Sequence, residues 1–528
     1  MSLFLIGLVP IILFLVLLAG LKKSAMFSAY TSLVTAIILT FIVPAWRMPV
    51  QGILASILEG FAVAWMPIGF VVIAALFAYD LSVKTGKIET VKKMLGNITT
   101  DKRAQALVLA WGFGGFIEGI AGYGTAVAIP AAIMVSLGFN PLNAALICLI
   151  ANSTPTAFGT VGLPVTTMVS KLGLDKAGNF TPLFTSLLLL LLTCLIPFII
   201  VQMANKEIEG GKNPAFGKGI VPVILASILG YLIQPIIAFT MGAELTTILS
   251  SLLAMILMIV SIKMFVKNDE GFEKAHVTGQ EAFLAWLPYI LMIVLIVGTS
   301  PVVAHIHEML EPTTTKFNFA LGNQATWFKD GGDPSVTFKW LLAPAAPLFL
   351  ATVIAGFIQR AKIKDMWEVL WNTTVHKIPS LTVIMGIVAL SVVMKHSGMI
   401  QSIADGFVNL TGKGFPLISP FLGTIGTFVT GSDLSSNLLF GDLQHSVAEG
   451  LKPGSDMLKS LFIASNTAGA TGGKMISPQN IAIAASTVGL VGQEGDMLKF
   501  TIKYFYIKSK KRFYASFFIL SEIFIYFF

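Results

Sequence analysis

Charged residues are scarce in this chain of 528 residues: they make up 12% of the sequence, whereas a soluble domain carries about 25%. Hydrophobic residues reach 55%, and long apolar runs recur from one end to the other. This combination excludes a series of soluble domains and predicts a chain that is embedded in a lipid bilayer. Cysteine is scarce as well. Cys148 and Cys194 both lie in apolar stretches, which excludes a disulfide framework and predicts no metal centre and no cofactor.

The net charge of +8 does not indicate nucleic-acid binding, because the basic residues lie in short loops between apolar segments. That distribution is typical of membrane proteins, whose cytoplasmic loops are rich in Lys and Arg. Residues 1–21 have no basic segment before them and are long enough to span a bilayer. We therefore expect a retained helix there and not a cleaved signal peptide.

Apolar stretches of roughly 20 residues are the unit that spans a membrane, because backbone groups in hydrocarbon must be satisfied within a helix. Three further regions are apolar but are interrupted by Gly, Pro, Ser, Thr and Asn. Together they predict an all-α polytopic membrane protein with about 12 to 14 membrane segments. The clear spans are 3–21, 25–45, 57–80, 180–203, 219–242, 245–265, 281–303, 340–359 and 378–396, and the interrupted regions are 105–139, 143–174 and 416–490.

The interrupted regions belong to an internal repeat, in which IANSTPTAFGTVGLP (150–164) also lies against IASNTAGATGGKMISP (463–478) with a drift of one or two residues in the offset. KTGKIETV (84–91) matches KHSGMIQSI (395–403), GGFIEG (114–119) matches GTFVTG (426–431), and GFNP matches GLKP, all at an offset of 312 residues, as in Gly86 and Gly398. Several matches in order at one offset indicate a duplication. The predicted organisation is N-terminal helices (1–56), a first repeat (57–203), connecting helices with an exposed polar loop at 304–338 (204–368), a second repeat (369–498) and an atypical tail (499–528).

Loop charge predicts how the two repeats are oriented. The loop 84–103 holds six basic residues, and its counterpart 397–415 holds one. The loop 360–377 holds four basic residues, and its counterpart 46–56 holds one. Because basic loops face the cytoplasm, equivalent helices cross the membrane in opposite directions. Inverted repeats with re-entrant hairpins and broken helices are a recurring architecture of secondary transporters.

Polar residues interrupt corresponding apolar stretches of both repeats. In inverted-repeat transporters, the ends of broken helices meet the substrate near the membrane midplane, and helix N-termini suit a carboxylate. Hydroxyl and amide groups would add directional hydrogen bonds. The alternative is that small residues only allow close helix packing. The predicted substrate-binding residues are Asn152, Ser153 and Thr154 in the first repeat and Ser465, Asn466 and Thr467 in the second.

Ionisable residues inside apolar stretches are costly and mark functional sites. Glu118 and Asp433 are candidates to take up and release a proton, with a permanent ion pair as the alternative. Asp442 and His445 extend this relay or lie in a solvated loop. Lys474 is a candidate countercharge for an anionic substrate or for Asp433, with a lysine reaching the membrane surface as the alternative.

Sequence signatures of other energy sources are missing. AGATGGKM (468–475) resembles a phosphate-binding loop, but Ala468 replaces the first glycine and Met475 replaces the Ser or Thr. No constellation of nucleophile and base stands out, so we do not expect an enzyme. A passive channel remains a minor alternative. The pattern favours transport driven by an ion gradient.

Three blocks resemble the bacterial L-lactate permease family, and the similarity runs from near residue 1 to about 503. They are WGFGGFIEGIAGYGTAVAIPAAIMVSLGFNPLNAALICLIANSTPTAFGTVGLPV (111–165), GTFVTGSDLSSNLLFGDLQ (426–444) and ASNTAGATGGKMISPQNIAIA (464–484). The resemblance implies a symporter of the bacterial inner membrane that takes up L-lactate with a proton, and often D-lactate and glycolate. It also implies paired Ser-Asn-Thr tips, a mobile transport domain and a scaffold that forms a homodimer.

Two features depart from the family pattern. The first repeat has Asn-Ser-Thr at 152–154 where the pattern has Ser-Asn-Thr, and the tail after about Lys503 is rich in Lys, Phe and Tyr. We place no function in that tail.

The alternative function is a sodium-coupled symporter for another small mono- or dicarboxylate.

Overall fold

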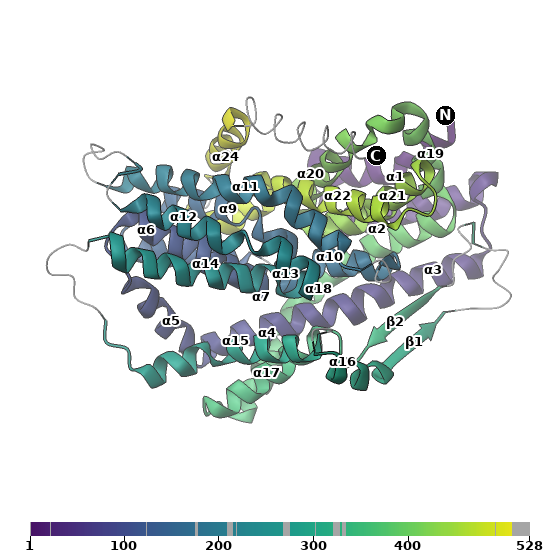
Figure 1. The fold of residues 1–528 in the computed structure, drawn as a ribbon. Helices are drawn as coiled ribbons and strands as arrows, with labels where there is room; N and C mark the ends of the chain where they lie inside the picture. Colours follow the sequence, from purple (N-terminus) through teal and green to yellow (C-terminus); the bar gives the residue numbers. More distant parts are fainter. Residues whose placement is uncertain are drawn as a thin grey trace.

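The chain folds almost entirely into helices (Figure 1). The computed structural model describes residues 2–21, 23–122, 124–174, 178–208, 215–217, 219–267, 275–300, 303–319, 328–329, 334–490 and 493–508. The tail after residue 508 and Tyr123 therefore lie outside the described residues.

The first half of the chain carries the N-terminal helices and the first predicted repeat. Its N-terminal elements are α1 (Ser2–Leu15), the π-helical turn η1 (Val16–Gly20), α2 (Ala25–Ile42) and η2 (Pro44–Trp46). Those that follow are α3 (Val50–Val63), η3 (Ala64–Gly69), α4 (Phe70–Lys84), α5 (Lys87–Gly96), α6 (Lys102–Ala106), η4 (Leu107–Phe113), α7 (Gly114–Ile120), α8 (Thr125–Ser136), α9 (Pro141–Ala151), η5 (Pro155–Phe158), α10 (Gly159–Lys171), α11 (Phe180–Ala204) and η7 (Asn205–Glu207).

The second half consists of connecting elements and the second predicted repeat. The connecting elements are α12 (Ile220–Tyr231), α13 (Gln234–Met241), α14 (Ala243–Phe265), α15 (Gly279–Thr299), α16 (Ala304–Leu310), η9 (Glu311–Thr313), β1 (Thr314–Asn318), β2 (Ser335–Lys339) and α17 (Ala345–Ile358). The last elements are α18 (Ile363–His396), α19 (Met399–Thr411), η10 (Gly412–Leu417), α20 (Ser419–Thr430), α21 (Asp433–Leu451), α22 (Asp456–Ile476), α23 (Pro478–Thr487) and α24 (Glu494–Lys508).

Seven of the described helices are long and apolar enough to cross a membrane, and α9 with the segment Pro155–Lys171 forms a further, bent pair. Four shorter apolar helices accompany them. The predicted all-α polytopic membrane protein is thus confirmed. The predicted 12 to 14 membrane segments are reached only when the bent pair and the shorter helices are counted as membrane-embedded.

Element order in the two halves agrees with the predicted offset. The segment Val50–Lys84 is a span of 35 residues, and Ile363–His396 is a span of 34 residues. A left-handed glycine follows each of them, Gly86 with φ 70° and Gly398 with φ 82°, and then a shorter helix begins. A glycine suits both turns because it adopts positive φ without strain. The duplication and the opposite orientation of its halves stay predictions.

The second half differs from its prediction at one point. Ser465, Asn466 and Thr467 do not interrupt a helix, because α22 runs unbroken from Asp456 to Ile476. Glycines in this helix serve close packing: a Cβ on Gly469 or Gly473 would collide with the backbone of α20. The packing alternative therefore explains the Gly-rich stretch. The chain breaks later, at Ser477, before Pro478 begins α23.

The predicted polar loop 304–338 contains structure that its composition did not indicate. It holds the short helix α16 and strand β1, which pairs antiparallel with β2 from Thr314↔Lys339 to Asn318↔Ser335. Figure 1 shows this hairpin at the periphery, outside the helical body.

Candidate functional site

A break between α9 and η5 forms the tip of the first hairpin. Asn140 caps α9 by accepting hydrogen bonds from the backbone N–H groups of the first turn, and Pro141 takes the first helical position, where no N–H is needed. The helix ends at Ala151, and the chain bends by 56° before it continues toward Lys171. The break predicted at 152–154 is therefore present.

The backbone just after this break is strained. Thr160 and Val161 have φ of 47° and 56°, a region that β-branched residues rarely adopt. Such conformations persist where surrounding packing imposes them, and they gather at binding sites. Here the Thr160 hydroxyl donates to the Ala121 carbonyl oxygen at 3.3 Å, and the Thr247 hydroxyl of α14 donates to the Pro155 carbonyl oxygen at 3.2 Å. These bonds fix the tip against α7 and α14.

The three predicted residues of this tip are all buried. Ser153 donates to the Ile150 carbonyl oxygen at 2.7 Å, so its hydroxyl satisfies the local turn. Neither the amide nitrogen nor the amide oxygen of Asn152 has a hydrogen-bond partner among the described residues, and neither does the Thr154 hydroxyl. Buried polar groups are normally paired, so Asn152 and Thr154 offer hydrogen-bonding capacity to a ligand.

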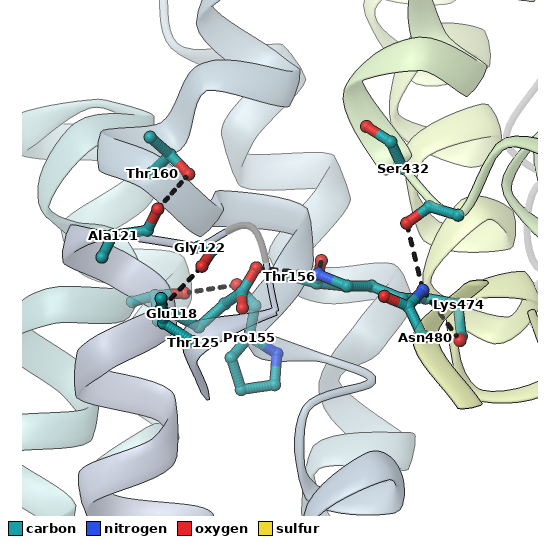
Figure 2. A network of polar contacts seen from close by, with 12 residues as sticks. Glu118, Ala121, Gly122, Thr125, Pro155, Thr156, Thr160, Ser432, Lys474 and Asn480 are labelled. Carbon is teal, nitrogen blue, oxygen red and sulfur yellow. Dashed lines mark hydrogen bonds and ion pairs between the residues drawn. The ribbon is translucent and has the colours of Figure 1, made fainter. Parts of the chain in front are cut away.

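An ion pair next to this tip joins the two halves of the chain. Lys474 Nζ near the end of α22 lies 2.8 Å from Glu118 Oε1 on α7, and both side chains are buried. The same ammonium group donates to the Thr156 hydroxyl in η5. Figure 2 shows Lys474 reaching from the second half of the chain toward Thr156 and Glu118. The predicted cation and one predicted acid are therefore direct partners.

Gly159 makes room for the Glu118 carboxylate, and a Cβ on Gly122 would lie at ordinary van der Waals distance from it. A Cβ on Gly159 would lie 2.5 Å from Glu118 Oε1, and a Cβ on Gly122 would lie 3.6 Å from it. Gly122 also has a positive φ of 57°, and its carbonyl oxygen accepts a hydrogen bond from the Thr125 hydroxyl. The carboxylate thus lies against backbone from α10 and from the turn after α7.

Asp433 belongs to the same cluster. It is buried at the first position of α21, after the N-cap Ser432, and it interacts electrostatically with Lys474 and Glu118. The Thr156 and Thr427 hydroxyls lie near it, but neither Asp433 oxygen accepts a hydrogen bond within the described part of the chain. Two acids and one cation are therefore buried in the same part of the interior, where an ion without a partner is costly.

The predicted residues on α22 lie in a separate amide network. Asn466 donates to the Asn437 amide oxygen at 2.9 Å and accepts from Gln444 at 3.1 Å. Asn437 also donates to the Thr467 hydroxyl at 2.9 Å and to the Pro164 carbonyl oxygen at 2.9 Å. Asn466 therefore has less free capacity for a ligand than Asn152. Ser465 is only half-buried, on another side of the helix.

Asp442 and His445 lie further along α21, away from the Glu118 pair. Asp442 forms a buried ion pair with Lys171, and His445 interacts electrostatically with Asp442. The sequence did not single out Lys171, Thr156 or Asn437, although each is polar within an apolar stretch. Among the described residues, no three His, Cys, Asp or Glu side chains gather as a metal-binding group.

Comparison with known proteins places this chain in a family. The family model for L-lactate permease matches residues 3–509. An L-lactate permease of Streptococcus iniae is 38% identical over 451 residues, covering 84% of this chain and 91% of that protein. An L-lactate permease of Bacillus subtilis (strain 168) is 34% identical, covering 94% and 92%. The glycolate permease GlcA of Escherichia coli (strain K12) is 32% identical, covering 95% and 92%.

Proposed function

This chain belongs to the L-lactate permease family, and from that premise we propose that it takes up L-lactate by proton symport across the bacterial inner membrane. Glycolate is proposed as a further substrate because one relative carries the name of a glycolate permease, and D-lactate is proposed from the family resemblance alone. The family and the spanning helices already make it a multi-pass membrane permease.

The observation that carries the proposal is Lys474, a buried cation beside the hairpin tip. A 2-hydroxy acid presents one carboxylate and one hydroxyl group. Lys474 is the countercharge for the carboxylate, and Asn152 and Thr154, which have no partners among the described residues, supply hydrogen bonds that orient the anion. Ser153, Ser465, Asn466 and Thr467 stay predicted binding residues, although Ser153 bonds to its own turn and Asn466 and Thr467 belong to a separate amide network.

Proton coupling is proposed for the acids around this cation. Glu118 and Asp433 are buried within the cluster, where gain or loss of a proton changes the charge that Lys474 must balance. Asp442 and His445 lie further along α21 and stay candidates for a relay toward the membrane surface. No cofactor takes part in this proposal, since the ion gradient supplies the energy.

Uptake of labelled L-lactate into proteoliposomes with an imposed pH gradient tests the proposal. We expect accumulation with the gradient, in medium free of sodium, and loss of accumulation when a protonophore collapses it. Accumulation that requires sodium would overturn proton symport and favour the alternative, a sodium-coupled symporter of another small mono- or dicarboxylate. Counterflow with glycolate, pyruvate and a dicarboxylate defines the substrate range, and the mass of the purified protein in detergent tests the homodimer.

A further inference from the structure

The cluster at the hairpin tip holds two carboxyl groups and one cation: Glu118, Asp433 and Lys474. Asn480 donates hydrogen bonds to the Gly431 carbonyl oxygen at 3.0 Å and to the Lys474 carbonyl oxygen at 3.3 Å, so the turn before Asp433 lies beside the end of α22 (Figure 2). We propose, building on the proton symport proposed above, that Glu118 and Asp433 share the transported proton and that Lys474 sets how many protons they hold. Neither acid alone is then the proton carrier.

Several of the elements that surround the cluster carry no charged residue. The described elements α8, α9, η4 and η5, which pack against α7, carry no charged residue, and neither does α20, which packs against α21. The charged groups with which Asp433 interacts most strongly are Lys474 and Glu118. Many charged residues on the surrounding helices have partners outside the cluster: Lys171 and Lys395 interact with Asp442, His396 with Glu59, Glu368 with Lys84, Lys459 with Glu449, and Asp496 with Lys499. Glu244 lies beside Gly242, and Lys263, Lys364, His376, Asp405 and Asp456 are exposed.

Each acid has an oxygen that can hold a proton. Glu118 Oε1 accepts from Lys474, whereas Glu118 Oε2 and both Asp433 oxygens have no hydrogen-bond donor among the described residues. The Thr156 hydroxyl accepts from Lys474 and lies near Asp433, and a hydroxyl can accept and donate at once. The geometry therefore allows the proton to reside on either carboxyl group.

Electrical neutrality of the cluster then sets how many protons move with each substrate anion. Without substrate, the cluster is neutral when the two carboxyl groups hold one proton, because the remaining carboxylate balances Lys474. When a monocarboxylate becomes the partner of Lys474, neutrality requires that both carboxyl groups are protonated. The difference is one proton for each anion. Because a net charge in the membrane interior is costly, the forms that cross are the neutral ones.

The same balance of charges determines which class of substrate the site accepts. A single cation balances a single carboxylate, so a dicarboxylate would add a charge that neither acid can neutralise once both hold a proton. The site therefore favours monocarboxylates.

Loss of one acid leaves the other able to supply the proton, so coupling survives either single substitution.

The test uses the purified full chain in proteoliposomes with a trapped pH dye and labelled L-lactate. In the wild-type protein we expect about one proton to move with each lactate, independent of membrane potential. E118Q and D433N are expected to transport more slowly with the same ratio. A wild-type protein that does not accumulate lactate with a proton gradient would overturn the proposed function. If the wild-type protein couples lactate uptake to protons and either single variant does not, the proposal that the two acids share the proton would be overturned, and the proposed function would stand.

The decisive variant removes both acids. A buried lysine left alone can itself lose its proton, so E118Q/D433N is combined with K474R, whose guanidinium group stays charged. We expect lactate counterflow to be slower than in the wild-type protein but above that of protein-free vesicles, while proton movement falls to the level of those vesicles; coupling that persists overturns the proposal. Monodisperse elution in detergent is the folding control. If K474R alone abolishes counterflow, E118Q/D433N is measured at mildly acidic pH instead. Loss of proton movement with counterflow retained then supports the proposal, and persistent coupling overturns it.

Discussion

Lys171 and Asp442 form a second buried ion pair, with 2.5 Å between Lys171 Nζ and Asp442 Oδ2. Ser391 of α18 donates a hydrogen bond to the same carboxylate oxygen and accepts one from Lys171 at 3.1 Å. Three helices that are distant in the sequence, α10, α18 and α21, therefore meet at one carboxylate.

Removal of one partner of this pair is expected to destabilise the fold. K171M leaves the Asp442 carboxylate buried without its cation, and breaking a buried pair in this way costs about 3–5 kcal/mol of unfolding free energy. K171M/D442N removes both charges and should recover much of that loss. Thermal unfolding of the purified protein in detergent measures both effects.

An exposed pair on α24 provides the matched control. Lys499 and Asp496 are 3.2 Å apart, with side chains 82% and 68% exposed. K499M should change the unfolding free energy by about 0.5 kcal/mol or less, because water screens such pairs. If K171M proved as stable as K499M, the Lys171–Asp442 contact would have no structural role.

Spanning helices could be predicted from the sequence because the bilayer forces apolar runs to satisfy their backbone within a helix. The same rule identified Glu118 and Lys474, since ionisable residues stand out in apolar stretches. It could not pair them, because they are 356 residues apart and their contact depends on how distant helices pack. Lys171 was missed because, with α10 ending there, a lysine resembles an ordinary C-terminal cation.

Helix α22 shows where local composition misleads. Polar and glycine residues at 465–473 predict a break, yet the helix continues to Ile476. Gly469 and Gly473 lie against α20, so their small size is used for close contact between helices. Asn466 is satisfied by Asn437 and Gln444. Tertiary partners override local propensity here, and those partners cannot be read from one segment.

Gly159→Ala is expected to disrupt the Glu118–Lys474 pair. The new methyl group would lie 2.5 Å from Glu118 Oε1 and 3.2 Å from its Cδ, so the carboxylate must move. A displacement of roughly 1 Å at a transport site can lower a rate by about 100-fold. The initial rate of proton-driven lactate uptake measures the effect. Gly298→Ala, in α15 with open space around its Cα, is the control and should transport normally; equal rates for both variants would contradict the steric argument.

The Thr156 hydroxyl is expected to hold Lys474 in place. T156V keeps the shape of the side chain but removes the oxygen that accepts from the ammonium group. The ammonium group then loses one of its two acceptors and keeps Glu118; an unmet buried hydrogen bond costs about 1–3 kcal/mol, which should lower lactate uptake by roughly tenfold. T156S restores the hydroxyl and should restore most of the rate. A T156S variant as slow as T156V would indicate that the methyl group, and not the hydroxyl, matters.

Substitution by alanine is expected to affect lactate binding at Asn152 and stability at Asn466. Asn152 has no amide partner among the described residues, so N152A should leave the thermal unfolding midpoint unchanged. It should weaken lactate binding by the value of a hydrogen bond to a charged group, about 1.5–3 kcal/mol. N466A removes bonds to Asn437 and Gln444 and should lower stability by about 1–3 kcal/mol. Lactate counterflow and thermal unfolding of both variants separate these roles. Unchanged lactate exchange in both would count against a substrate site at the hairpin tip, whatever their stabilities.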